Sequence, residues 1–148
     1  MSTTSRPALL AMVVALLGAL VAVLSSDQDL RRRAEGGLAR RIRNATPAST
    51  LIPDGEIRDA AGLITRLTRE GFDGAILVRP LPIETDETIT ESYSYAIENY
   101  SLTNYWDSTW HVIYQPGYVN IEKIVTVEVA VYSVAREKLI WAGRMRSE

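Results

Sequence analysis

The run ALLAMVVALLGALVAVL, residues 8–24, is apolar without a break and is the stretch that decides the fold. Arg6 precedes it, and Ser25, Ser26 and Asp27 follow it. Three interpretations compete for this run: a secretory signal, a membrane anchor, or the first buried strand of the folded domain. Each interpretation gives the chain a different architecture and a different location.

The length of the run suits a membrane segment poorly. A bilayer core needs roughly twenty apolar helical residues, and seventeen of them at about 1.5 Å each reach only about 25 Å. A secretory signal has an apolar stretch of about 7 to 15 residues after a positive start, which Arg6 supplies. Residues 31–33 are all arginine, and positive clusters resist transfer across a membrane. An anchor inserted at this run would therefore leave the domain in the cytoplasm.

The end of the run has the form of a buried strand. Residues 20–24 are a short segment of valine, leucine and alanine. Gly18 comes before it and a Ser-Ser-Asp turn follows it. A strand of this length does not account for all seventeen residues. We therefore expect residues 1–17 to be a signal-like or membrane-seeking segment and residues 18–148 to form one domain, which this chain is long enough to close around a single core.

Two helices are predicted in the first half of this domain. Ser26 and Asp29 have the spacing of a capping box, so a first helix should begin there and end near Asn44. Its expected apolar stripe is Leu30, Ala34, Leu38 and Ile42. Residues 50–52 are expected to be a short extended segment, and a second helix should then run to Gly71. The core positions predicted for this second helix are Ile57, Ala60, Ala61, Ile64 and Leu67.

The second half predicts strands. Residues 72–79 contain an apolar run and not an alternating pattern, as in a strand buried on both faces, and Pro80 and Pro82 should close it. Alternating valines at 125–131 predict a strand with one core face, and residues 139–143 return as its hairpin partner. Between them, residues 85–104 resemble a loop or irregular hairpin. A further alternating segment should place Trp106, Trp110, Val112 and Tyr114 on one side.

This order of elements predicts an α/β (α+β) fold. We expect a two-layer domain in which two helices cover one face of a mixed sheet that ends in a C-terminal antiparallel hairpin. The first helix needs a strand before it, and the end of the apolar run is the segment available to supply one.

Charge is unevenly divided along the chain. Residues 1–80 hold eleven arginines and eight acids, whereas residues 81–148 hold five basic and ten acidic residues. Residues 81–120 contain six acids and no lysine or arginine, which would repel a phosphate backbone. The arginines of residues 31–43 are more typical of a solvated helix face, so we expect no nucleic-acid partner. The absence of cysteine excludes disulfides, thiolate catalysis and an acylated-cysteine anchor.

Four short pieces, in this order, have a familiar pattern: DLRRRAE (29–35), TPASTLIP (46–53), EGFDGA (70–75), and VYSV (131–134) with KLIWAG (138–143). Together they resemble small bacterial envelope proteins of unknown function, mostly lipoproteins, whose domain is similar to the amino-terminal domain of TolB. The resemblance covers roughly Ala19 to Arg146. It implies a leading strand at about residues 19–25 and an envelope location, and it brings no established catalytic residues. Such proteins commonly carry an acylated cysteine, which this chain lacks.

Most enzyme templates fail for lack of residues. One histidine and no cysteine exclude a two-histidine zinc helix and a thiol nucleophile. A serine triad would need Ser108, His111 and Asp107 to converge, yet they lie on one predicted strand whose neighbouring side chains point to opposite faces. We therefore expect His111 to be structural or at the surface, and no catalytic residue is assigned.

The acidic region contains paired carboxylates between Glu84 and Asp107, which a glycosidase could use at separations of about 5 to 10 Å. We expect a solvated acidic loop instead, because the sequence cannot supply the distance between two carboxylates. The spacing of Asp86, Glu87 and Glu91 lacks the glycine-containing pattern of a calcium loop. We therefore expect no metal and no cofactor.

Aromatic residues give the best candidate for binding. Eight of them fall within residues 93–118, where no lysine or arginine occurs. Aromatic rings beside acids suit a cationic peptide, a sugar ring or a partner protein. If alternation places Trp106, Trp110 and Tyr114 in the core, the remaining tyrosines form a surface. This predicted binding surface is Tyr93, Tyr95, Tyr100 and Tyr105.

The sequence thus predicts a non-enzymatic binding or assembly module of the bacterial cell envelope, periplasmic or membrane-associated. Its partners would be a protein, peptide or glycan of the envelope, with membrane association through Ala8 to Leu24 as an option. Two alternatives remain open: an envelope glycan hydrolase that uses the paired carboxylates, and a cytoplasmic domain held by an N-terminal anchor.

Overall fold

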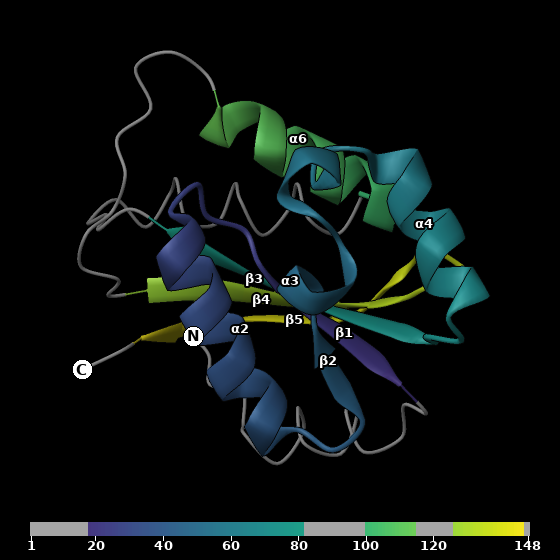
Figure 1. The fold of residues 1–148 in the computed structure, drawn as a ribbon, viewed down its shortest axis with the longest axis horizontal. Helices are drawn as coiled ribbons and strands as arrows, with labels where there is room; N and C mark the ends of the chain where they lie inside the picture. Colours follow the sequence, from purple (N-terminus) through teal and green to yellow (C-terminus); the bar gives the residue numbers. More distant parts are fainter. Residues whose placement is uncertain (1–17, 82–99, 115–125, 147–148) are drawn as a thin grey trace.

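The computed structural model describes residues 18–81, 100–114 and 126–146. Their helices pack against one five-stranded mixed sheet (Figure 1). In chain order the elements are β1 (Ala19–Val23), α2 (Gln28–Arg41), β2 (Ala45–Pro47), α3 (Ala48–Leu51), the 3-10 turn η1 (Asp54–Glu56), α4 (Ala60–Arg69), β3 (Gly74–Leu81), α6 (Leu102–Ile113), β4 (Thr126–Ser133) and β5 (Leu139–Arg146).

The end of the apolar run is an inner strand of the sheet, between β2 and β3. All five residues of β1 are buried, and β1 pairs in parallel with β2 on one side and with β3 on the other. Leu20 lies opposite Ala75 and Val23 opposite Val78. The predicted leading strand is therefore confirmed, and a continuous helix from residue 8 to residue 24 is not formed. Residues 1–17 lie outside the described part of the chain.

No helix in the described ranges is long and apolar enough to cross a membrane. The strand order is β2-β1-β3-β4-β5. β3 pairs antiparallel with β4, and β4 pairs antiparallel with β5. The mixed sheet and its C-terminal β4–β5 hairpin confirm the predicted α/β (α+β) architecture.

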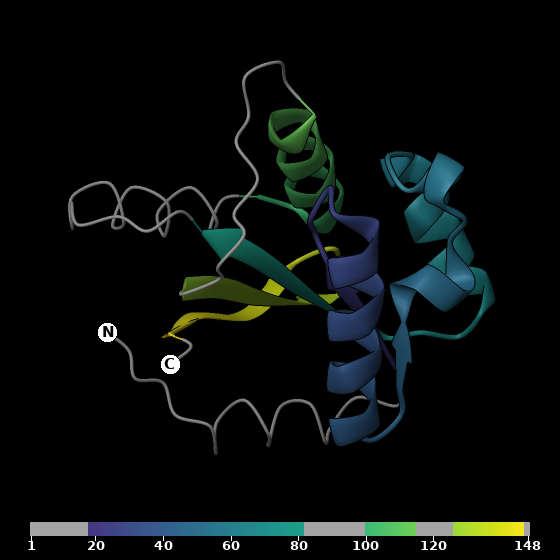
Figure 2. The same cartoon turned by 60° about the vertical axis from the view of Figure 1, so that its left-hand side comes forward.

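The two faces of the sheet carry different helices. Leu20, Ala22 and Leu77 belong to a core shared with α3, α4 and α6, here called the α6 face. Alternate residues such as Val21 and Ile76 form the other core, the α2 face. Ala34 and Leu38 of α2, together with Ile42 just after its end, pack against this second core. Figure 2 shows α2 along β1 and β2, while α6 lies above β3.

This helix placement differs from the expected one, in which both predicted helices cover the same face. Its cause is the strand order. The chain moves from β1 outward to β2 and then back past β1 to β3. Crossovers between parallel strands are almost always right-handed, so two crossovers in opposite directions put their helices on opposite faces.

Two local predictions around α2 are wrong. The N-cap of α2 is Asp27, whose side chain accepts a hydrogen bond from Leu30 N at 3.1 Å, and not Ser26. The extended segment after α2 is β2, Ala45–Pro47, whereas residues 50–52 belong to the helical turn α3 and its C-cap. Pro47 explains the change, because it ends the strand and serves as the N-cap of the turn.

The second predicted helix is confirmed as α4, with a later start. Asp59 caps it by accepting from Gly62 N at 3.0 Å, and Gly71 follows its end with a φ of +85°. Such a φ favours glycine. Leu63 and Leu67 are its buried residues, whereas the predicted core residue Ala61 is exposed.

β3 and β4 both end later than the sequence predicts. Pro80 lies beyond Val78, the last position paired with β1, so β3 continues against β4 alone as far as Leu81. β4 is buried on both faces, because Glu128 and Tyr132 are as buried as Val129 and Val131. The expectation of one core face is therefore wrong, and the helix that covers the second face, α6, is the reason.

Candidate functional site

The aromatic segment is a helix and not an alternating strand. Ser101 caps α6 by accepting a hydrogen bond from Asn104 N at 3.1 Å. Positions 106, 110 and 114 share one face of a strand and equally one face of a helix, so their spacing fits both periods. Val112 separates the two, because a helix turns it away from them. Val112 is 52% exposed, which contradicts its predicted core position.

Only part of the predicted tyrosine surface lies at the surface. Tyr93 and Tyr95 lie outside the described residues. Tyr100 is 39% exposed, in agreement with the prediction. Tyr105 is buried at 1% exposure, so its predicted surface position is wrong, and Tyr114, predicted in the core, is 45% exposed. The helical period exchanges these two residues, because it turns position 105 toward the sheet.

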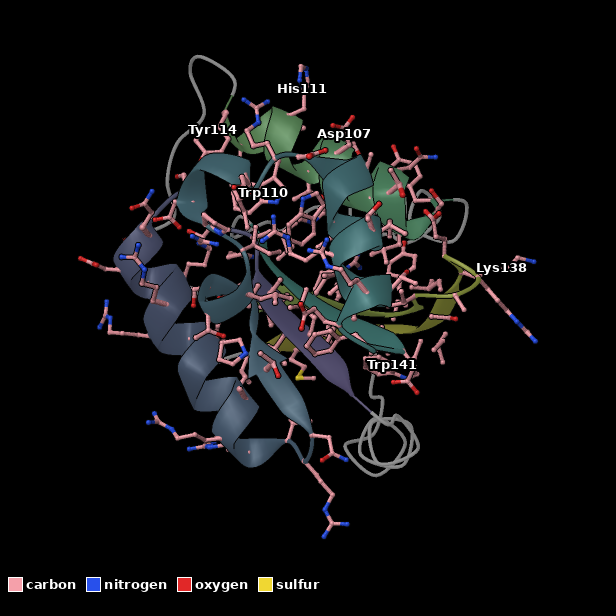
Figure 3. The ribbon with its side chains drawn as sticks, turned by 45° about the vertical axis from the view of Figure 1, so that its right-hand side comes forward. Asp107, Trp110, His111, Tyr114, Lys138 and Trp141 are labelled. Atoms are coloured by element: carbon pink, nitrogen blue, oxygen red, sulfur yellow. The ribbon has the colours of Figure 1, made fainter. Side chains whose placement is uncertain are left out.

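Three rings form a continuous aromatic stack along α6, from the core to the surface. Trp106 and Trp110 meet edge to face, with ring centroids 6.0 Å apart. Trp110 and Tyr114 are stacked, with centroids 5.7 Å apart and planes 25° apart. Both tryptophans are buried, whereas Tyr114 is the exposed end of the stack. In Figure 3 Trp110 points inward and Tyr114 lies at the end of the helix.

Arg58 lies on the outer side of this stack. Its guanidinium carbon is 5.0 Å from the centroid of the Tyr114 ring, within the range of a cation–π contact. Arg58 comes from the turn before α4, 56 positions earlier in the chain than Tyr114. Sequence reasoning missed Arg58, because no local pattern links two residues that only the packing of α4 against α6 brings together.

The two tryptophans of the stack differ in their indole N–H groups. Trp106 Nε1 donates to the Ile57 carbonyl at 2.7 Å, which ties α6 to the start of α4. Trp110 Nε1 is buried, and none of the described residues accepts a hydrogen bond from it. An unpaired buried donor is uncommon and costs about 1 to 3 kcal/mol. The stack is therefore fixed firmly at Trp106 and less firmly at Trp110.

The outer face of α6 holds the residues considered for a triad. Asp107 and His111 are both exposed, one helical turn apart, as Figure 3 shows. The surface position predicted for His111 is thus confirmed. Ser108 is also on α6, and its hydroxyl donates to the Asn104 carbonyl at 2.5 Å. The hydroxyl of Ser108, the candidate nucleophile, is therefore already hydrogen-bonded to the backbone of its own helix. The strand that the sequence predicted here is not formed.

Beneath α6 lies a buried polar cluster. Glu128 Oε1 accepts from the Tyr105 hydroxyl at 2.8 Å and is 2.6 Å from Arg79 Nη2. The Tyr132 ring lies 5.7 Å from that of Tyr105, and its hydroxyl donates to the Tyr100 carbonyl at 3.1 Å. Burial, followed by the negative charge of Glu128, raises the pKa of the Tyr105 and Tyr132 hydroxyls, so both stay protonated. These contacts fix α6 on the sheet.

A second buried carboxyl belongs to α2. Glu35 Oε2 accepts from Val23 N at 2.9 Å, and Oε1 accepts from Ser49 N at 2.8 Å. Burial raises the pKa of this carboxyl, and the two backbone N–H bonds oppose that shift. Both oxygens serve the backbone, so Glu35 is structural. Arg31, also buried, pairs with Asp54, which corrects the prediction that all the arginines of this helix are solvated.

The carboxylates proposed for glycan hydrolysis or calcium, residues 84–98, lie outside the described ranges. Within those ranges no group of three or more histidine, aspartate or glutamate side chains could hold a metal. A shallow pocket between η1 and α4 is lined by Glu56, Asp59 and Arg66. Glu56 pairs there with Arg66, and Asp59 caps α4, so both carboxylates already have structural partners.

Comparison with known proteins adds no relative. No protein-family model, curated protein or solved structure matches this chain significantly.

Proposed function

We propose that this chain is a non-enzymatic binding or assembly module of the bacterial cell envelope, and that it engages a partner protein through the outer end of the aromatic stack. The observation that carries the proposal is the exposure of Tyr114 on a ring stack whose lower members are buried. Rings held in this way lose little conformational freedom on binding, which is a property of binding hot spots.

The surroundings of Tyr114 indicate the chemistry of the partner. Arg58 adds a positive charge above the ring of Tyr114. A protein segment that presents an apolar or aromatic side chain next to a carboxylate would satisfy both Tyr114 and Arg58. The envelope location is supported by the residue patterns that resemble envelope proteins.

Site-specific photo-crosslinking tests the proposed interface. A photoreactive amino acid replaces Tyr114 in the full chain, expressed in bacterial cells, and a matched chain carries it at Arg33, which is exposed on α2. We expect a discrete protein adduct from position 114 that is absent from position 33. No adduct at 114, or the same adduct from both positions, would contradict the proposal.

The location is tested separately. A reporter enzyme that is active only outside the cytoplasm is fused after Glu148 and assayed in intact cells. Activity supports the envelope location, whereas an inactive but full-length fusion favours the alternative of a cytoplasmic domain on an N-terminal anchor.

A further inference from the structure

We infer that the free edge of β5 binds an extended acidic segment of another protein by adding it to the sheet as a sixth strand. β5 is the last strand of the sheet and, among the described residues, pairs only with β4. It is eight residues long and contains no proline. Long edge strands present a row of N–H and C=O groups to which another strand can pair.

The phase of the ladder shows which groups face outward. Val134 N donates to the Asp73 carbonyl, in line with the β3–β4 register, so even-numbered residues of β4 bond to β3 and odd-numbered ones to β5. Gly143 is opposite an odd-numbered β4 residue and therefore turns its backbone groups toward β4. Ala142 turns its N–H and C=O groups away from β4, toward the outer edge of the sheet.

Side chains at this edge favour an acidic partner. The turn before β5 and the strand itself carry four basic residues and one acid over positions 136–146. That acid, Glu137, already accepts from Thr103 N at 3.3 Å. The edge is thus basic on a chain whose net charge is −2. Ile140 and Met145, 40% and 38% exposed, give an entering strand apolar contacts as well.

The same charges argue against a second copy of this chain as the occupant. An antiparallel pair of β5 strands would bring positions 136–146 of one copy, which carry four basic residues and one acid, against the same positions of the other. Like charges opposite each other destabilise a strand pair. The basic residues would therefore repel another β5 edge and attract a strand that carries carboxylates.

Peptide binding to the full chain tests this inference. The probe is a fluorescently labelled eight-residue peptide of alternating glutamate and valine, and its control has lysine in place of glutamate. Fluorescence anisotropy should show saturable binding of the acidic peptide and at least tenfold weaker binding of the basic one. Equal binding of the two peptides would overturn the charge argument.

A backbone variant separates strand addition from simple charge attraction. Ala142→Pro removes an N–H that points outward and should weaken binding at least tenfold, whereas Ala142→Ser keeps the N–H and should bind like the unmodified chain. Equal binding by both variants would overturn strand addition. Tyr114→Ala should leave peptide binding unchanged, because it alters the surface of the proposed function and not this edge.

Amide exchange keeps the test valid if the proline variant fails to fold. In the unmodified chain, the acidic peptide should slow hydrogen exchange of the Ala142 amide and leave that of Gly143 unchanged, because Gly143 faces β4. No slowing at Ala142, or peptide-dependent dimers of the chain in place of a one-to-one complex, would overturn the inference.

Discussion

The two edges of the sheet are built in opposite ways. β2 has three residues and ends at Pro47, whereas β5 has eight and no proline. Beyond the end of β2, the side chain of Glu35 accepts the Val23 N–H, the group that a longer β2 would have paired. At the other edge the described residues place no such side chain over the outward amide of Ala142. A side chain of the fold thus closes one edge, whereas the partner proposed above would cover the other.

Among the variants that test this difference between the edges, the largest effect is expected from removing the side chain that closes the β2 edge. Glu35→Ala leaves the Val23 and Ser49 N–H groups buried without acceptors. We expect the free energy of unfolding to fall by about 3 kcal/mol, since each unpaired buried donor costs about 1 to 3 kcal/mol. Urea denaturation followed by circular dichroism measures it.

Two further variants serve as references for this measurement. Glu35→Gln keeps one acceptor oxygen and should lose about half as much stability. Glu70→Ala removes an exposed carboxylate and should change the free energy by less than about 0.5 kcal/mol. Similar losses from Glu35→Ala and Glu70→Ala would mean that Glu35 does not close the edge.

At the β5 edge the important side chain is the indole ring of Trp141, and not a carboxyl group. The Trp141 indole lies over Gly143, where an added Cβ would come within 2.6 Å of Trp141 Cη2. Gly143→Val must displace the indole, which packs on the α2 face, as its place below the sheet in Figure 3 indicates. Overpacking of this kind costs about 2 kcal/mol.

Thermal and urea unfolding of Gly143→Val measure this cost, and Gly55→Ala is the control, because an added Cβ there meets no atom within 4 Å. Equal stability of the two variants would show that Trp141 moves aside freely, and that β5 has no need of a glycine at this position.

The sequence predicted the strands better than it predicted what closes or opens their edges. β1 and β3 are short apolar runs bounded by turn residues, and such runs are local patterns that survive in the fold. α6 was mistaken for a strand because residues 106, 110 and 114 fit both periods. The tyrosine surface failed with it, since the helical period buries Tyr105 and exposes Tyr114.

Contacts between elements left no signal in the sequence. In the sequence, Glu35 is one more charged residue on an arginine-rich helix. Its role depends on the short length of β2, because β2 ends before it can supply an acceptor for the Val23 N–H. Arg58 and Tyr114 meet only because α4 packs beside α6. Local patterns can predict neither contact, because each depends on where the tertiary fold places a distant element.

A change of pH perturbs the β2 edge less than removal of Glu35, because the protonated carboxyl still accepts hydrogen bonds. Burial raises the pKa of Glu35 above its ordinary value of 4.5, so the folded state holds this proton more tightly than the unfolded state. The contribution of Glu35 to stability is therefore fully present below pH 4.5 and is lost as the pH rises through the folded-state pKa.

The comparison of unmodified chain and Glu35→Gln across pH 4 to 8 isolates this contribution, because glutamine does not titrate. We expect the stability difference between the two to shift in favour of Glu35→Gln as the pH rises. A constant difference would mean that folding leaves the pKa of Glu35 unchanged, and a shift the other way would mean that the two backbone N–H bonds lower it.

The smallest expected effect strengthens the closed edge. Gly37 lies inside α2, the helix that carries Glu35, and an added Cβ there meets no atom within 4 Å. Gly37→Ala should raise the free energy of unfolding by about 0.5 to 1 kcal/mol, because alanine loses less backbone entropy in a helix than glycine. Binding of the acidic peptide at β5 should not change, since the variant acts at the opposite edge. A gain in stability that also altered peptide binding would mean that the two edges are coupled through the sheet, and the contrast between them would no longer be a contrast between independent sites.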